Sequence, residues 1–341
     1  MELQHASQAG SWTLNASSIS VEQWIAPLSG YLGLRDSLGD FRIAGNLQGE
    51  ASGTISRGSI CGRLHCRLSD ASLSSDTRGL RVEGLNVSLD LEGPAPLLSQ
   101  GTPTLSFREA RFNQVIARNG HIAFSLSKSG ALYIAGARLD LFGGAVEIRD
   151  ETIPLQSVLS REVSLGIHLS NLSLAEISAM LPDVIAEAHG RLSGQIRVAW
   201  SAKNGFKFGN GRFQIDRAES VEIRFNPQPG FLTSHTPERL TILPAWTGVL
   251  QRWFSPKNPA YESLRQIEMG LMSLHVETLS VELHPAGDAQ GRTATVRISA
   301  RPAVSSAVDR IDFEVNVSGP LDEVIRLGMD KKVSIKNGGA R

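Results

Sequence analysis

One-sided β-strands recur along almost the whole chain, and this pattern constrains the fold more than any other feature. In the stretch IDFEVNV, residues 311–317, every second residue is apolar and the residues between them are polar. Successive side chains of a strand point to opposite faces, so this alternation is typical of a strand with one apolar and one solvated face. The stretches GLNVSLDLEG, HIAFSLSKSG, GRLSGQIRVAW, VEIRF, LSVELH and TATVRISAR have the same pattern.

Turn signals separate these stretches. Gly, Asn, Ser and Asp gather in KSGA, KNGF, GNG and PAGDAQG. The strands follow one another at intervals of about 10–15 residues, which is typical of an antiparallel meander. In RLDLFGGAVEI the apolar positions change register at Gly143-Gly144, and we interpret that pair as a β-bulge or sharp bend that restores one apolar face.

Helices are few and short. Ser20 with Gln23, and Ser173 with Glu176, form capping boxes at the start of apolar helical stripes. We predict one short helix after Ser20. Further helices are expected near residues 173–181, 245–271 and 320–328.

The two capping-box helices belong to a longer similarity within the chain. Each follows a strand ending in Ile-Ser or Leu-Ser, and each precedes a Gly-x-Leu-x-Gly stretch, at 45–49 and at 190–194. We interpret this as a degenerate internal duplication, with a first β-groove repeat over 1–155 and a second over 156–341. The alternative is that helix-then-strand units resemble one another by chance.

The charge balance argues against some partners. The chain has 34 Lys and Arg residues against 34 Asp and Glu residues, and no Lys- or Arg-rich run. Nucleic-acid binding depends mainly on cationic contacts to phosphate, so no nucleic-acid partner is predicted. No apolar run approaches the ~20 residues of a spanning helix, and the N-terminus lacks the pattern of a signal peptide. The protein is therefore either cytosolic or a fragment whose targeting segment and anchor lay upstream, and we favour the fragment.

No constellation of residues predicts catalysis. The sequence contains no G-x-S-x-G, H-E-x-x-H, P-loop or CxxC motif, and its eight histidines are scattered. Cys61 and Cys66 are five residues apart on an expected strand, hence on opposite faces. We predict a non-enzymatic protein without a cofactor or a metal site. A carbohydrate-active β enzyme is a further possibility, and it would need two carboxylates about 5–10 Å apart.

A sheet of one-sided strands must still bury its apolar face. The helices are too few to cover it, which leaves a sandwich, or an open sheet curved into a trough. In a trough, each methylene of an acyl chain that leaves water contributes about 0.8 kcal/mol. We predict a mainly β fold with a long curved antiparallel sheet that forms an open groove, with a few short helices. The predicted groove lining is Leu139, Leu141, Val146, Ile148, Ile196, Val198, Leu279, Val281, Phe313 and Val315.

Five motifs carry a family resemblance. LFGGAVEI, IHLSNLSLAEISAMLP, HGRLSGQIRV, FKFGNGRFQI and IDFEVNVSGPLDEVIRLGM occur in this order. Over roughly residues 105–330 the chain resembles the C-terminal part of YdbH-like proteins, in the AsmA-like, bridge-like lipid transfer superfamily of diderm bacteria. The stretch FNPQPGFLTSHTPERLTILPAW departs from the family pattern.

The resemblance implies a periplasmic β-groove that is tethered in the inner membrane by an N-terminal anchor and reaches towards the outer membrane. Such a groove moves phospholipid along a hydrophobic trough. It also implies a small outer-membrane lipoprotein that continues the sheet at the C-terminal end. An older label for the family is dicarboxylate transport. The sequence does not support this label, because it shows no cationic cluster that would hold two carboxylates. The alternative to lipid transport is a structural scaffold of the cell envelope with a sealed core, which binds partners by adding a strand at an exposed edge.

Overall fold

The fold is mainly β, as the alternating sequence predicts. The computed structural model describes residues 10–22, 41–56, 59–77, 79–94, 98–99, 101–127, 131–154, 163–180, 185–201, 205–216, 219–234, 236–240 and 256–317. Within them, strands account for 69% of the residues and form one large antiparallel sheet that is not closed into a barrel. This part of the chain has two helices.

The chain divides into two compact units. Unit 1 comprises residues 1–168 with 197–208, and unit 2 comprises 169–196 with 209–341. The predicted division into repeats 1–155 and 156–341 rests on a proposed duplication in the sequence. Compact units do not test a duplication, so this division stays a prediction.

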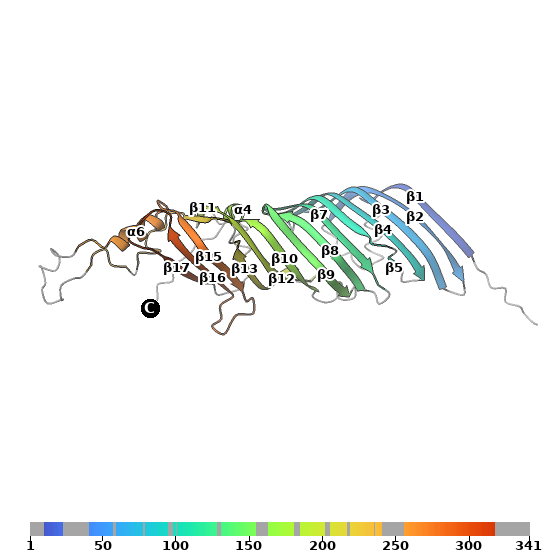
Figure 1. Cartoon of the computed structure of the whole chain (residues 1–341). Coiled ribbons are helices and arrows are strands. Elements are labelled where there is room, and N and C mark those ends of the chain that lie inside the picture. The colour runs from blue at the N-terminus through green and yellow to red at the C-terminus, as the bar shows by residue number, and fades with distance from the viewer. Residues whose placement is uncertain are drawn as a thin grey trace, which may run out of the picture. The chain divides into compact units, whose positions relative to one another are not determined.

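Unit 1 is a meander of neighbouring hairpins (Figure 1). Its strands pair in the order β1, β2, β3, β4, β6, β7, β8, β9, and the short β5 adds to β4. The bounds are β1 Gly10–Ser20, β2 Arg42–Ser56, β3 Ser59–Ser75, β4 Leu80–Pro94, β5 Leu98–Ser99, β6 Thr104–Phe112, β7 Val115–Leu126, β8 Ala131–Leu141 and β9 Gly144–Pro154.

Unit 2 has shorter strands and both helices. The strands β14, β15, β16 and β17 pair in sequence, and β11 adds to β14. The bounds are α4 Leu174–Ser178, β11 Ile185–His189, β14 Val221–Phe225, α6 Pro259–Glu268, β15 Leu274–Leu283, β16 Ala294–Pro302 and β17 Ile311–Val317. Three strands contribute residues to both units: β10 Val163–Ser173, β12 Arg191–Ser201 and β13 Gly205–Ile215.

The helices agree in part with the sequence. The Ser173 side chain accepts a hydrogen bond from the Glu176 N–H and caps α4, as the capping box predicts, but the helix is shorter than 173–181. In α6 the N-cap is Asn258, and the helix lies within the predicted range 245–271. The helix expected at 320–328, residues 245–255 and most of the helix after Ser20 lie outside the described residues.

The strands of unit 1 share a line of distortion, which we call the crease and define by Asp70, Gly84, Arg108 and Asn119. Asp70, Gly84 and Asn119 have φ values of 44°, 64° and 52°. The β3–β4 register shifts on both sides of Ala71, and the β6–β7 ladder omits the Arg108–Asn119 pair.

The crease keeps one face apolar while the strands bend. Apolar residues that otherwise alternate take one step of three, from Leu68 to Ala71 and from Val82 to Leu85. One extra residue in a strand adds a local bend and restores the side-chain alternation beyond it. The long strands β2, β3 and β4 arch visibly in Figure 1. The Asp70 N–H donates to Asn86 Oδ1 at 3.0 Å, so this amide, although out of the ladder, has a partner.

The predicted bulge at Gly143-Gly144 is wrong. Leu141 pairs with Gly144, so Phe142 and Gly143 form a two-residue hairpin turn, with φ values of 48° and 63°. Positive φ at both central residues is the geometry that matches the twist of a tight hairpin. The two apolar pairs therefore lie on adjacent strands, β8 and β9, rather than along one bent strand.

The two Gly-x-Leu-x-Gly junctions are built alike. The Val21 N–H donates to Gly45 O at 3.1 Å, and the Leu174 N–H donates to Gly190 O at 3.0 Å. A Cβ at either glycine would lie 2.6 Å from a side-chain carbon of the next strand. Both junctions therefore use the N–H of the residue after a strand-ending serine to hold a glycine against which a neighbouring strand packs closely.

We expect Gly84→Ala to lower the free energy of unfolding by about 1–2 kcal/mol, because an L-residue is strained at this φ. The new Cβ would also lie 2.8 Å from Arg108 Cβ. Urea denaturation monitored by circular dichroism measures the change. Gly136→Ala is the matched control, since a Cβ at Gly136 of β8 would meet no other atom within 4 Å. Equal stability of the two variants would contradict a structural role for the crease.

Candidate functional site

An unbroken row of apolar residues crosses unit 1 at right angles to its strands. Each residue is the direct cross-strand partner of the next. Directly opposed side chains lie on the same face of a sheet. We call this row the unit-1 track, and it consists of Leu47, Leu68, Val87, Leu105, Ile122, Ala137 and Ile148.

Every side chain of the unit-1 track is half-buried, neither sealed in a core nor fully exposed. Neighbouring strands lie about 4.8 Å apart, so seven strands carry the track over about 29 Å. The track is therefore a continuous apolar stripe along which an alkyl chain could lie without crossing a polar side chain.

Unit 2 has a shorter row of the same kind. Phe213 pairs with Val281, Val281 with Val296, and Val296 with Val315. We call these four residues the unit-2 track. Three of them are half-buried, and Val315 is 43% exposed. A bulge between Val276 and Thr278 keeps the apolar residues of β15 on this face, as the crease does in unit 1.

Three of the predicted lining residues belong to these rows. Ile148 belongs to the unit-1 track, and Val281 and Val315 belong to the unit-2 track. Leu139 and Val146 are direct partners next to Ile148. The remaining predicted residues are Leu141, half-buried at the end of β8, Ile196 and Val198 on β12, and Leu279 and Phe313, which both pair with Ile298. Val146, Ile196 and Leu279 are buried, with 8–9% of their surface exposed. That these residues line a lipid path stays a prediction.

Sequence reasoning missed most of the unit-1 track. Its residues on β2, β3, β4, β6 and β7 are absent from the predicted lining. The signal was present as the single step of three in an otherwise alternating run, for example Leu64, Cys66, Leu68, then Ala71 and Leu73. That step marks both the crease and the face that continues across it.

The opposite face carries ion pairs. Glu147 binds Arg138 at 2.9 Å and also contacts Arg149. Glu282 accepts from Arg212 at 2.9 Å and from Arg297 at 3.3 Å. The Glu147–Arg149 pair lies along β9, and the other three pairs join neighbouring strands. The arginines are exposed and the glutamates half-buried, so this face is wetted while the tracks lie on the other.

The ion pairs lower the pKa values of their carboxyls. The hydrogen bond from Arg149 holds the pKa of Glu147 below its ordinary value. Arg212, and then Arg297, do the same for the pKa of Glu282. Both carboxylates are therefore charged at neutral pH and matched by arginines.

One cavity of ≈ 230 Å³ opens on the wetted face of unit 1. It is lined by Arg81, Glu83, Glu109 and Arg111. Arg81 pairs with Glu83 at 2.9 Å and Arg111 with Glu109 at 3.1 Å, so its charges are already matched. Its lining residues are all charged and offer no apolar side chain against which an acyl chain could pack.

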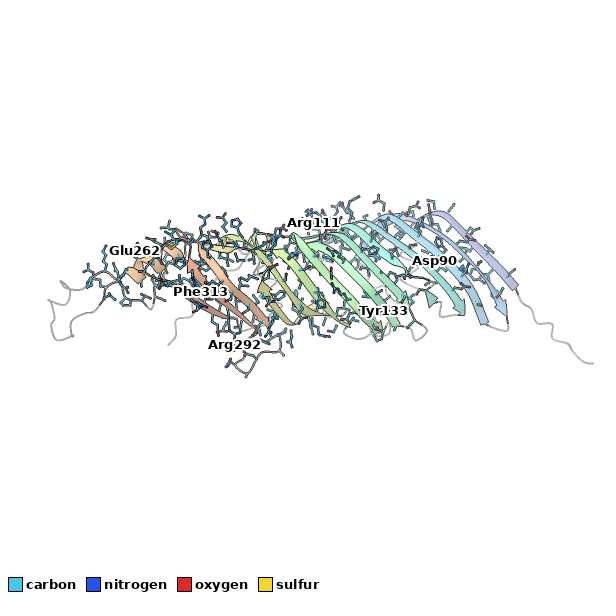
Figure 2. The ribbon with its side chains drawn as sticks, viewed as in Figure 1. Asp90, Arg111, Tyr133, Glu262, Arg292 and Phe313 are labelled. Carbon is cyan, nitrogen blue, oxygen red and sulfur yellow. The ribbon has the colours of Figure 1, made fainter. Side chains whose placement is uncertain are left out.

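An aromatic cluster lies on the apolar face of unit 2. Phe313 lies on β17 (Figure 2). Its ring centroid is 5.8 Å from that of Phe225 at the end of β14. Phe231 stacks on Phe313 with 6.4 Å between centroids and 10° between ring planes. Phe231 comes from the segment 226–240, which follows β14 and departs from the alternating pattern.

A metal site and a membrane-spanning helix are both absent from the described residues. They contain no group of three or more His, Cys, Asp or Glu side chains placed to hold a metal ion. The helices within these ranges are too short or too polar to cross a membrane.

A comparison with protein families gives one match. The family model described as "YdbH-like: Intermembrane phospholipid transport protein YdbH" matches residues 5–232. The match begins upstream of the range 105–330 predicted from the motifs and ends before its last motif. Neither the curated proteins nor the solved structures give a match to the chain.

We expect the protein to lose stability as the pH falls below the ordinary glutamate value of 4.5, through the lowered pKa values of Glu147 and Glu282. A carboxyl with a lowered pKa binds fewer protons folded than unfolded, so it stabilises the fold above its unfolded pKa and ceases to do so below its folded pKa. The loss should be modest and should shrink in high salt, because these pairs are exposed. Urea midpoints measured across the acid range give the slope.

Glu282→Gln tests whether Glu282 contributes to the loss of stability at low pH. The variant should have a shallower dependence of the midpoint on pH than the parent protein, because the amide does not titrate. Asp76→Asn is the control, since the Arg42–Asp76 pair is 3.5 Å apart and exposed on both sides. A slope identical to that of the parent would show that Glu282 contributes nothing.

Proposed function

Because the chain belongs to the YdbH-like family of intermembrane phospholipid transport proteins, we propose that it moves phospholipid between two membranes by conducting acyl chains along the unit-1 and unit-2 tracks. The observation that supports this most directly is the unit-1 track itself. It is continuous over seven strands, and each of its side chains remains accessible to a ligand.

The dimensions of the unit-1 track suit an acyl chain. The hydrocarbon core of a bilayer is about 30 Å thick and holds two leaflets, so one acyl chain spans about 15 Å. The track, at about 29 Å, accommodates one extended chain with room to advance. Each methylene that leaves water on the track contributes up to about 0.8 kcal/mol, and the half-buried surface supplies part of this value.

The two faces divide the lipid and the solvent between them. Acyl chains bind to the apolar face, and the phosphate headgroup stays in water at the open side. Successive positions along the track offer similar apolar contacts, so a lipid can advance without a large barrier at any one residue. The chemistry requires no bond to form or break, and the arrangement is that of a carrier surface rather than of an enzyme.

We expect the protein to act in the periplasm of a diderm bacterium, between the inner and outer membranes. The description of the family as intermembrane phospholipid transport proteins supports this location. We further propose a small outer-membrane lipoprotein as a partner at the C-terminal end, and attachment to the inner membrane at the other.

A sealed scaffold is the alternative function, and one observation favours it. Ile134, Ile153 and Val163 are 7–9% exposed and form a buried cluster with their neighbours in unit 1. If the whole apolar face were packed in this way, acyl chains would have no access. Three residues of the unit-1 track, Ile122, Ala137 and Ile148, pack against this cluster and are half-buried. The other four track residues, on β2, β3, β4 and β6, are also half-buried and are not part of the cluster.

Val281→Asp should abolish the binding of phospholipid to unit 2. A carboxylate on the unit-2 track would have to lose water without a partner when an acyl chain covers it, at a cost of several kcal/mol. The measurement is lipid that is crosslinked to a photoreactive residue at Val296 in living cells and detected by mass spectrometry.

Ser280→Asp is the matched control for Val281→Asp. Ser280 lies on the opposite face of the same strand, directly across from Arg297, where an added carboxylate has a partner. This variant should retain parental crosslinking. If the parent protein carries no lipid at Val296, or if both variants behave alike, the transport proposal is wrong and the scaffold is favoured.

A further inference from the structure

The segment 226–240, which we call the capping segment, is fastened to both ends of α6. At the N-terminal end of the helix, the Asn258 N–H donates to Glu238 O at 2.8 Å and its Nδ2 donates to Pro237 O at 2.9 Å. Near the C-terminal end, the Gln228 N–H donates to Glu268 O at 2.8 Å. Its described residues, 226–234 and 236–240, therefore belong to the hydrogen-bonded structure of unit 2.

A single carboxylate fixes the middle of the capping segment. Glu268 is 3% exposed, and its Oε2 accepts from the N–H groups of Leu232 at 2.9 Å and Thr233 at 3.1 Å. Its Oε1 accepts from the Thr233 hydroxyl at 2.8 Å. Burial raises the pKa of the Glu268 carboxyl, but these hydrogen bonds outweigh burial and hold the pKa below its ordinary value.

The position of Glu268 is unfavourable for the helix alone. It is the last residue of α6, where the partial negative charge of the helix terminus opposes an acidic side chain. The carboxylate is stabilised there because it binds the capping segment. Its role is therefore to position that segment.

The positioned residue is Phe231, the immediate neighbour of Leu232. The Phe231 N–H donates to Gln228 O at 3.1 Å, which closes the turn that presents its ring. The ring stacks on Phe313 and meets Phe225 edge-on at 5.8 Å. Phe225 and Phe313 both lie on the apolar face of the sheet, because Ile223 pairs with Leu274 and Phe313 pairs with Ile298.

Phe231 thus covers the part of the apolar face next to the unit-2 track. The row Leu279, Ile298 and Phe313 is the neighbour of the row Val281, Val296 and Val315 along the same strands. Val315 is 43% exposed, whereas Phe313, two residues away on the same face, is half-buried beneath Phe231. The accessible apolar surface is therefore narrower at Phe313 than at Val315.

We propose that Phe231 is a side wall of the acyl path on unit 2, and that Glu268 is the residue that positions it. The wall confines an acyl chain to the unit-2 track and excludes it from Phe313, which the alternating pattern alone assigns to the lining. This inference rests on the proposed lipid transport and defines which residues determine the width of the path.

The test compares two photocrosslinking positions on one strand. A benzoylphenylalanine residue replaces Val315 in one protein and Phe313 in another, and phospholipid adducts are measured in cells that carry the full chain. In the parent background, the residue at position 315 should yield adducts and the residue at 313 should yield few. Phe231→Ala should raise the yield at 313 several-fold and leave the yield at 315 unchanged.

Two further variants test the positioning residue. Thr233→Val removes only the hydroxyl that binds Glu268, and Glu268→Ala removes the carboxylate; both should raise the yield at 313, the second by more. Glu262→Ala, an exposed change on the same helix (Figure 2), is the control and should have no effect. If Glu268→Ala fails to fold, Phe231→Ala and Thr233→Val still decide the result.

The outcomes separate the wall from the transport function. Equal yields at 313 and 315 in the parent, or a yield at 313 that Phe231→Ala does not change, would overturn the wall and leave transport intact. An absence of adducts at both positions in every background would overturn the transport function, and the wall with it.

Discussion

Strands that are hydrogen-bonded along their length cannot bend one at a time, and the structure of unit 1 depends on this constraint. A bend confined to one strand would pull its amides away from both neighbours. The distortion therefore recurs on successive strands, at Asp70, Gly84 and Asn119, and the displaced amide of Asp70 binds the Asn86 side chain. Because each bend also adds one residue, the apolar side chains stay on one face from end to end of the strand.

The two faces of the sheet meet different requirements. Arginines and glutamates of the wetted face pair with one another, as Glu282 does with Arg212 and Arg297 on neighbouring strands. These charged side chains therefore have their partners on the wetted face. The apolar face has no second layer of comparable extent among the described residues, since α4 and α6 are short. Half-buried rows remain there, which a ligand rather than the protein can cover. Intermembrane lipid transport, the activity named for the family, needs such a surface.

The period-two alternation predicted the strands, because it follows from local side-chain direction. The turn signals between closely spaced strands predicted the antiparallel order, and the scarcity of helices predicted the open sheet. The alternation misassigned Gly143-Gly144, since a glycine pair serves equally well in a bulge and in a hairpin turn, and only pairing of Leu141 with Gly144 distinguishes the two. The crease was not predicted, because Asp70 and Asn119 adopt a conformation more often taken by glycine. The contact of Phe231 with Phe313 could not be predicted from the sequence pattern, because it joins residues far apart in the chain.

The paired junctions at Gly45 and Gly190 have a consequence for how such a protein grows. Each needs one backbone amide after a strand-ending serine and one glycine that supplies the carbonyl, and both groups come from one contiguous stretch of chain. A copied stretch would bring its own corner with it and would need from the host only a free strand edge. If the chain arose by the predicted duplication, each further copy would lengthen the sheet by a fixed number of strands.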